Sequence, residues 1–144
     1  MKIIARRRPA SAKPRGAPEA KLQMTVRRYL EYALPADIMW TASLTGVFLS
    51  PQARAKAKAM GVRRGWPDLS FMFPDGVTRF IELKADGSLS PEQRDFRDLS
   101  RPHGVWALCR SVEGVEAVLI SWGVKLKAST GGHPDLLSSA DWAA

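Results

Sequence analysis

The sequence predicts a single α/β domain, in which one mixed β-sheet is flanked by helices. A chain of 144 residues is the usual length of one domain. Hydrophobic residues make up 45% and charged residues 25%, a balance that supports an apolar core. Helical spacing and strand alternation follow each other in the order helix, strand, helix, hairpin, helix, strand, helix. These elements pack most simply as one sheet with helices on its faces.

Helices are expected where apolar residues recur every three or four positions, or where capping residues mark a start. Residues 18–34 carry such a stripe and are closed by Pro35, which cannot continue a helix. A second helix is expected to begin at Ser50, which proline follows directly. A third begins at Ser90 with a Ser-x-x-Gln capping box, and a fourth covers residues 112–122.

Strands are expected over four short segments of alternating or apolar residues. Residues 38–43 form the first of them. A Pro-Asp-Gly turn separates residues 68–73 from residues 79–84, so these two segments form a hairpin. Residues 105–109 are the fourth strand.

Positive charge is concentrated in two places. The formal net charge is +8; residues 1–16 carry six basic residues and residues 50–66 carry five, with no acidic residue in either segment. Concentrated positive charge is typical of proteins that bind nucleic acids, although a solvated tail and a solvated helix face are the plainer alternative. The basic residues expected to contact DNA are Arg54, Lys56, Lys58, Arg63 and Arg64.

Composition excludes several classes of protein and suggests how the chain is divided. The sequence has no apolar run near the ~20 residues that a bilayer requires, and its one cysteine excludes an internal disulfide framework. The basic N-terminus lacks the apolar segment of a signal peptide, so a cytoplasmic protein is expected. We expect a disordered basic tail over 1–17, the folded domain over 18–124 and a loosely ordered tail over 125–144.

Charged side chains interrupt the predicted hairpin where an apolar strand would be expected. Glu82 and Lys84 lie on one face of their strand, and Asp68 opens the partner strand close to them. Two carboxylates beside an ammonium group form a hard-oxygen cation site, and this combination suits phosphodiester hydrolysis with Mg²⁺. The alternative is an ordinary cross-strand ion pair on a solvated sheet face.

The order of the motifs resembles the PD-(D/E)XK nuclease superfamily, and most closely its VRR-NUC family, the virus-type replication-repair nucleases. The resemblance extends from about Glu19 to Trp122 and implies a restriction-endonuclease-like core. The matching motifs are Glu19-x3-Gln23, Gly61-Val62-x2-Gly65-x-Pro67-Asp68-Leu69, Glu82-Leu83-Lys84 and Ser90-Pro91-Glu92-Gln93.

The resemblance implies roles for individual residues. Asp68 and Glu82 correspond to the metal-binding carboxylates, with the backbone carbonyl of Leu83 as a further ligand. Lys84 corresponds to the catalytic lysine. Glu19 corresponds to the first-helix acid, which reaches the metal directly or through water.

Gln93 has two competing interpretations. The resemblance places it among the catalytic residues, where it would touch the lysine, a metal-bound water or a phosphate. Its position three residues after Ser90 instead makes it the glutamine of a capping box. Both uses call on the same side-chain amide.

The function expected from these motifs is that of a Mg²⁺-dependent DNA endonuclease, with Mn²⁺ as a substitute. A small domain without a recognition module has little surface for base readout, so selectivity for branched, flapped or junction DNA is expected, as in replication, repair or recombination. Single-domain members of the family look like Holliday-junction resolvases, which implies a homodimer. The alternative function is a DNA-binding module that keeps the fold without cutting.

Overall fold

A computed structural model describes residues 17–43 and 49–132. No helix in those two ranges is long and apolar enough to cross a membrane. The basic segment 1–16 and residues 133–144 lie outside the described part, so the tails expected there stay predictions. The elements in chain order are α1 (Ala17–Ala33), β1 (Met39–Ala42), α2 (Pro51–Ala59), β2 (Leu69–Met72), β3 (Thr78–Leu83), α3 (Pro91–Ser100), β4 (Trp106–Cys109) and α4 (Val112–Ser121), with short 3₁₀ turns at Arg101–His103 and Thr130–Gly132.

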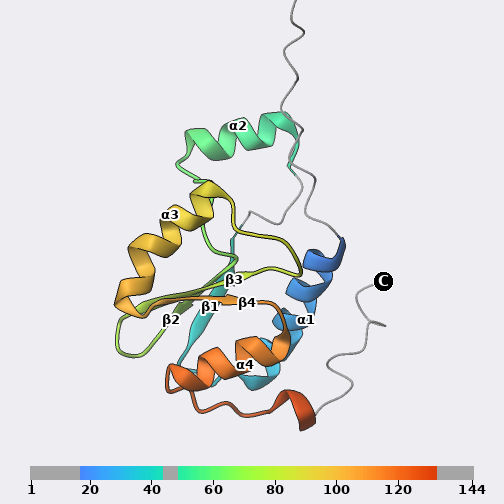
Figure 1. The fold of residues 1–144 in the computed structure, drawn as a ribbon, viewed down its shortest axis with the longest axis vertical. Coiled ribbons are helices and arrows are strands. Elements are labelled where there is room, and N and C mark those ends of the chain that lie inside the picture. The colour runs from blue at the N-terminus through green and yellow to red at the C-terminus, as the bar shows by residue number, and fades with distance from the viewer. Residues whose placement is uncertain (1–16, 44–48, 133–144) are drawn as a thin grey trace, which may run out of the picture.

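The strands form one mixed sheet in the order β1-β2-β3-β4 (Figure 1). β1 pairs with β2 and β2 with β3 in antiparallel fashion, whereas β3 and β4 are parallel. The parallel pair needs a crossover connection, and α3 provides it. The predicted fold class, a single mixed sheet with helices on its faces, is therefore confirmed.

One face of the sheet carries the apolar core. Figure 1 shows α1 and α4 on this side of the strands, away from α2 and α3. Ile81 and Leu83 of β3 point to it and are fully buried, as are Leu30 of α1 and Leu119 of α4. These side chains pack into one cluster that includes residues from both helices and three strands.

The opposite face is covered less completely. Phe80 of β3 packs edge-on against Phe96 of α3, with ring centroids 4.9 Å apart. Met39 and Met72 face one another across β1 and β2, beyond the reach of α3, and are 75% and 59% exposed. This half-open face is the one to which alternation assigns Glu82, since Phe80 and Glu82 are two residues apart in β3.

The packed part of the chain continues beyond residue 124, where the domain was expected to end. The Tyr29 hydroxyl of α1 lies 3.0 Å from both the Glu116 carboxylate of α4 and the carbonyl of Ala128. Thr130 donates its backbone N–H to the same carboxylate at 2.7 Å. Residues up to the final 3₁₀ turn are thus fastened to α1 and α4.

Candidate active site

Two buried carboxylates lie opposite each other where β2 begins and β3 ends. Leu69 pairs with Ile81, so the next position of the antiparallel register places Asp68 across from Glu82. Each carboxylate is only 1% exposed. Asp68 Oδ2 accepts a hydrogen bond of 2.7 Å from the backbone N–H of Leu83, which closes the hairpin where the strand ladder stops.

Gln93 caps α3 and also contacts Glu82, a partner that neither interpretation of the sequence named. Its Oε1 accepts from the backbone N–H of Ser90 at 2.8 Å, and the Ser90 hydroxyl accepts from the backbone N–H of Gln93, which completes the capping box. Its Nε2 donates to Glu82 Oε1 at 2.8 Å. The oxygen of the amide therefore caps α3 while its nitrogen binds the carboxylate, and the contact with the lysine, a metal-bound water or a phosphate stays a prediction.

Lys84 and Glu19 meet at the edge of this site. The Lys84 Nζ and Glu19 Oε1 are 3.9 Å apart, and both side chains are mostly buried, at 15% and 13% exposed. The backbone N–H of Lys84 donates to the carbonyl of Cys109, which continues the pairing of β3 with β4. The first turn of α1 thereby brings its acid to the lysine.

The donor set is that of a hard divalent cation with water in its coordination shell. In the described ranges, no three His, Cys, Asp or Glu side chains gather closely enough to hold a metal by themselves. Mg²⁺ does not require such a cage, because it is commonly held by one or two carboxylates together with waters and substrate phosphates. Asp68 and Glu82 meet that requirement, and Glu19 does not join them as a third close ligand.

The loop before Asp68 is anchored on the first turn of α3. Gly65 has a φ of +80°, and a Cβ on it would lie 2.5 Å from the backbone carbon of Glu92, so glycine is needed both for conformation and for space. Trp66 follows and packs edge-on against Phe80 and Phe96, with centroids 5.8 and 4.9 Å away, while 43% of it stays exposed.

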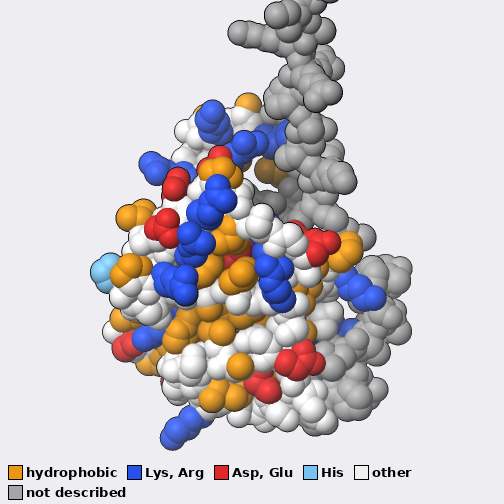
Figure 2. Space-filling view, viewed as in Figure 1, with side chains coloured by type: hydrophobic (Ala, Val, Ile, Leu, Met, Phe, Trp, Pro, Cys, Tyr) orange, Lys and Arg blue, Asp and Glu red, His pale blue; other side chains and the backbone are white. Residues whose placement is uncertain are grey.

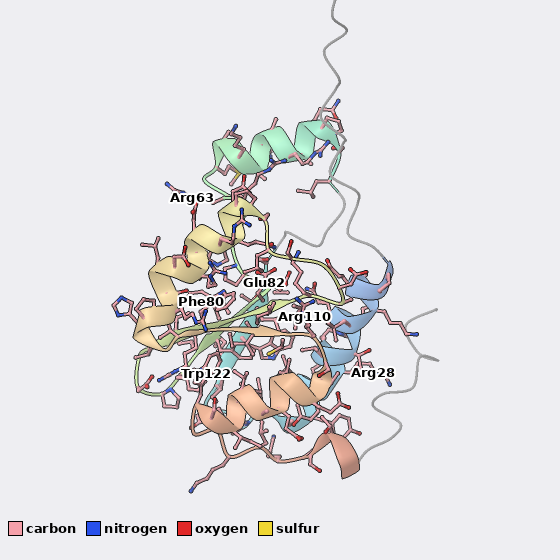
Figure 3. The ribbon with its side chains drawn as sticks, viewed as in Figure 1. Arg28, Arg63, Phe80, Glu82, Arg110 and Trp122 are labelled. Carbon is pink, nitrogen blue, oxygen red and sulfur yellow. The ribbon has the colours of Figure 1, made fainter. Side chains whose placement is uncertain are left out.

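The predicted DNA-contacting residues all lie on the outside of the molecule. Arg63 and Arg64 are exposed on the loop anchored by Gly65, and Figure 3 shows Arg63 between α2 and α3. α2 has no buried residue, and its three basic side chains are exposed. Figure 2 shows basic side chains that extend from α2 over α3 to the middle of this face.

The sequence did not predict that Arg110 lies beside Lys84 at the edge of the site. Cys109 pairs with Leu83, so the next residues of the two parallel strands, Arg110 and Lys84, leave the sheet side by side. Arg110 is exposed, and its guanidinium donates to the carbonyl of Gly87 at 2.9 Å, which ties the loop after β3 to β4 (Figure 3). No local pattern signals this placement, because it depends on the register of the parallel pair.

Comparisons with known proteins give one similarity of structure. No protein-family model matches the chain, and no curated protein matches it. A solved structure described as a VRR_NUC domain is similar to it: the two share 23% sequence identity, the match covers 74% of this chain and 97% of that chain, and the TM-score is 0.46. This is the family that the motifs resemble. At this identity and TM-score the similarity carries no argument about activity, which depends on the side chains of the site.

Proposed function

We propose that this protein is a metal-dependent endonuclease that hydrolyses phosphodiester bonds of DNA. The observation that carries the proposal is the buried pair of carboxylates, Asp68 and Glu82, beside the ammonium group of Lys84. Two ionised carboxylates that face each other repel, and a cation bound between them would relieve that repulsion. Such an arrangement is typical of functional sites rather than of structural ones.

Asp68, Glu82 and the backbone carbonyl of Leu83 would hold Mg²⁺, with Mn²⁺ as a substitute, and Glu19 would reach it directly or through water. The bound ion supplies Lewis-acid chemistry, which makes water a better nucleophile at neutral pH and offsets charge on the scissile phosphate. The oxygen ligands fit this ion, since hard cations prefer carboxylate and carbonyl oxygens.

The remaining residues position the reacting groups. Lys84 is held by Glu19, so its ammonium is placed to stabilise the negative charge that develops on the phosphate. Gln93 holds Glu82 in one orientation from a rigid helix start. Arg63 and Arg64 would contact the DNA backbone close to the site, and Arg54, Lys56 and Lys58 would contact it farther away.

We propose selectivity for branched, flapped or junction DNA, because a domain this small has little surface for base readout. Every basic residue assigned to DNA lies on an exposed helix or loop suited to phosphates, so DNA geometry rather than base sequence would be recognised. The homodimer stays a prediction. Light scattering with and without junction DNA tests it by measuring the molar mass of the protein in solution. Two sites related by a twofold axis would cut two strands of a symmetric junction.

A cleavage assay tests the proposal. Purified protein is incubated with branched, flapped and plain duplex DNA, with Mg²⁺, with Mn²⁺ and with chelator alone. We expect metal-dependent cutting that Asp68→Asn and Glu82→Gln each lower at least ~100-fold, whereas the exposed Glu113→Gln leaves it unchanged. DNA binding without cutting by the wild type under all metal conditions would instead establish the non-cleaving DNA-binding module.

A further inference from the structure

A groove lies beside the carboxylates on the same face of the sheet. Phe80 pairs with Trp106 and Glu82 with Leu108, so these four side chains share the face covered by α3. The groove has a volume of about 370 Å³ and lies at the β4 edge of the sheet. We call it the β4-edge groove; its lining residues are Leu89, Arg97, Arg101, Trp106, Ala107 and Leu108.

Two arginines line the groove, and one of them, Arg97, forms an ion pair with Asp98. Arg94, Arg97 and Arg101 are spaced by three and four residues, which places them along one side of α3. Two of them line the groove, and no carboxylate is among its described lining residues. Arg97 donates its Nε to Asp98 at 3.0 Å, which uses one of the five N–H donors of a guanidinium.

The groove also offers an aromatic surface. Trp106 is partly exposed, and Leu108, next to it on the same face, is 36% exposed. Arginines beside a partly open indole are the combination that binds single-stranded nucleic acid, because the guanidinium groups contact phosphates while a base stacks on the ring. In duplex DNA the bases are stacked on one another, so only an unpaired nucleotide can use the indole.

We propose that the β4-edge groove binds an unpaired nucleotide of the nucleic-acid substrate, with its phosphates on Arg97 and Arg101 and its base on Trp106. The choice of nucleic acid as ligand rests on the proposed function. Because Leu108 is the register partner of Glu82, the strand in the groove passes directly beside the carboxylates. The protein would therefore favour substrates in which a single-stranded segment adjoins the scissile bond.

Binding measurements without divalent metal test this groove independently of cleavage. The probe is a fluorescein-labelled oligothymidylate of about 12 nucleotides, compared with a duplex of the same length by anisotropy over a range of salt concentrations. The Arg97→Gln/Arg101→Gln variant should bind the oligothymidylate about tenfold more weakly, and its salt slope should fall by about 1.4. Trp106→Leu should weaken the same complex about tenfold without changing the slope.

A matched charge control is Lys125→Gln/Lys127→Gln, which removes two exposed cations from the segment packed against α1 and should change binding less than twofold. Circular dichroism melting checks that each variant is folded. If the double arginine variant or Trp106→Leu does not fold, the single variant Arg101→Gln, at an exposed residue, replaces it in the binding test. The proposal is overturned if the variants lose affinity for the single strand and for the duplex equally. It is also overturned if the arginine variant binds the oligothymidylate as tightly as the lysine control does. A wild type that shows the expected binding but cuts no DNA refutes the nuclease and leaves the groove intact.

Discussion

The two faces of the sheet differ in what they contribute, although the same strands build both. On the α1 and α4 side, Ile81 and Leu83 are fully buried among apolar side chains. On the α3 side, Phe80 and Glu82 of the same strand meet aromatic rings, an amide and a second carboxylate. One face therefore supplies the burial that stabilises the fold, and the other can hold charges that a core would not tolerate.

Two carboxylates, the partly buried Glu116 and the buried Glu82, lie on opposite sides of the sheet and show how a structural acid differs from a candidate catalytic one. Glu116 accepts hydrogen bonds from Thr130 and lies within hydrogen-bond distance of the Tyr29 hydroxyl, so donors from separate segments surround it. Burial and the nearby Glu116 carboxylate raise the pKa of Tyr29, which stays protonated. Glu82 instead lies opposite another carboxylate, Asp68. The first arrangement joins elements together, whereas the second is suited to a cation.

The largest effect on the α3 face is expected from Lys84→Ala. Cleavage should fall about 100- to 1000-fold, because the ammonium that stabilises the developing charge is lost. Metal binding, measured by calorimetry with Mn²⁺, should be largely retained. The free energy of unfolding should also fall, because Lys84 and Glu19 are both mostly buried and the substitution removes one charge from their contact. Cleavage at the wild-type rate would show that the site is assigned wrongly.

A substitution on the α1 and α4 side of the sheet should lower stability and leave cleavage nearly unchanged. Leu119→Ala removes a fully buried side chain of α4 and should lower the free energy of unfolding by about 2–5 kcal/mol, measured in urea. At a temperature where the variant is folded, cleavage per molecule should stay within about twofold of the wild type, as Leu119 lies across the sheet from Glu82. A loss of cleavage as large as that of Lys84→Ala would mean that the two faces are not separable.

Local patterns predict most of the fold and the placement of the carboxylates, because both depend on short-range rules. Alternation in β3 assigns Glu82 to one face, the turn before β3 sets the register that brings Asp68 opposite it, and the capping box starts α3 at Ser90. The spacing of the arginines from Arg94 to Arg101 is also visible in the sequence, but residues 65–144 contain more acidic than basic residues, so their net charge does not indicate it.

Contacts between distant segments could not be predicted in the same way. The hydrogen bond of 2.8 Å from Gln93 to Glu82 requires the start of α3 to lie beside β3, and no sequence pattern gives that arrangement. The approach of Glu19 to Lys84 depends on how α1 crosses the end of the sheet. The packing of residues 125–132 depends on one carboxylate, Glu116, whose position in α4 looks like an ordinary exposed helix acid in the sequence.

The smallest effect separates the two basic segments that the sequence identifies. Gly65 and Trp66 hold Arg63 and Arg64 against the start of α3, a few residues before Asp68, so both can position the DNA backbone for attack. Arg63→Ala/Arg64→Ala should lower the single-turnover rate at saturating DNA about threefold to tenfold, in addition to weakening binding. Deletion of residues 1–16 removes six positive charges and should weaken binding and flatten its salt dependence, while the saturated rate stays the same. If the double alanine variant turns over as fast as the wild type once DNA is saturating, the arginines act as a second charged tail and the positioning role is refuted.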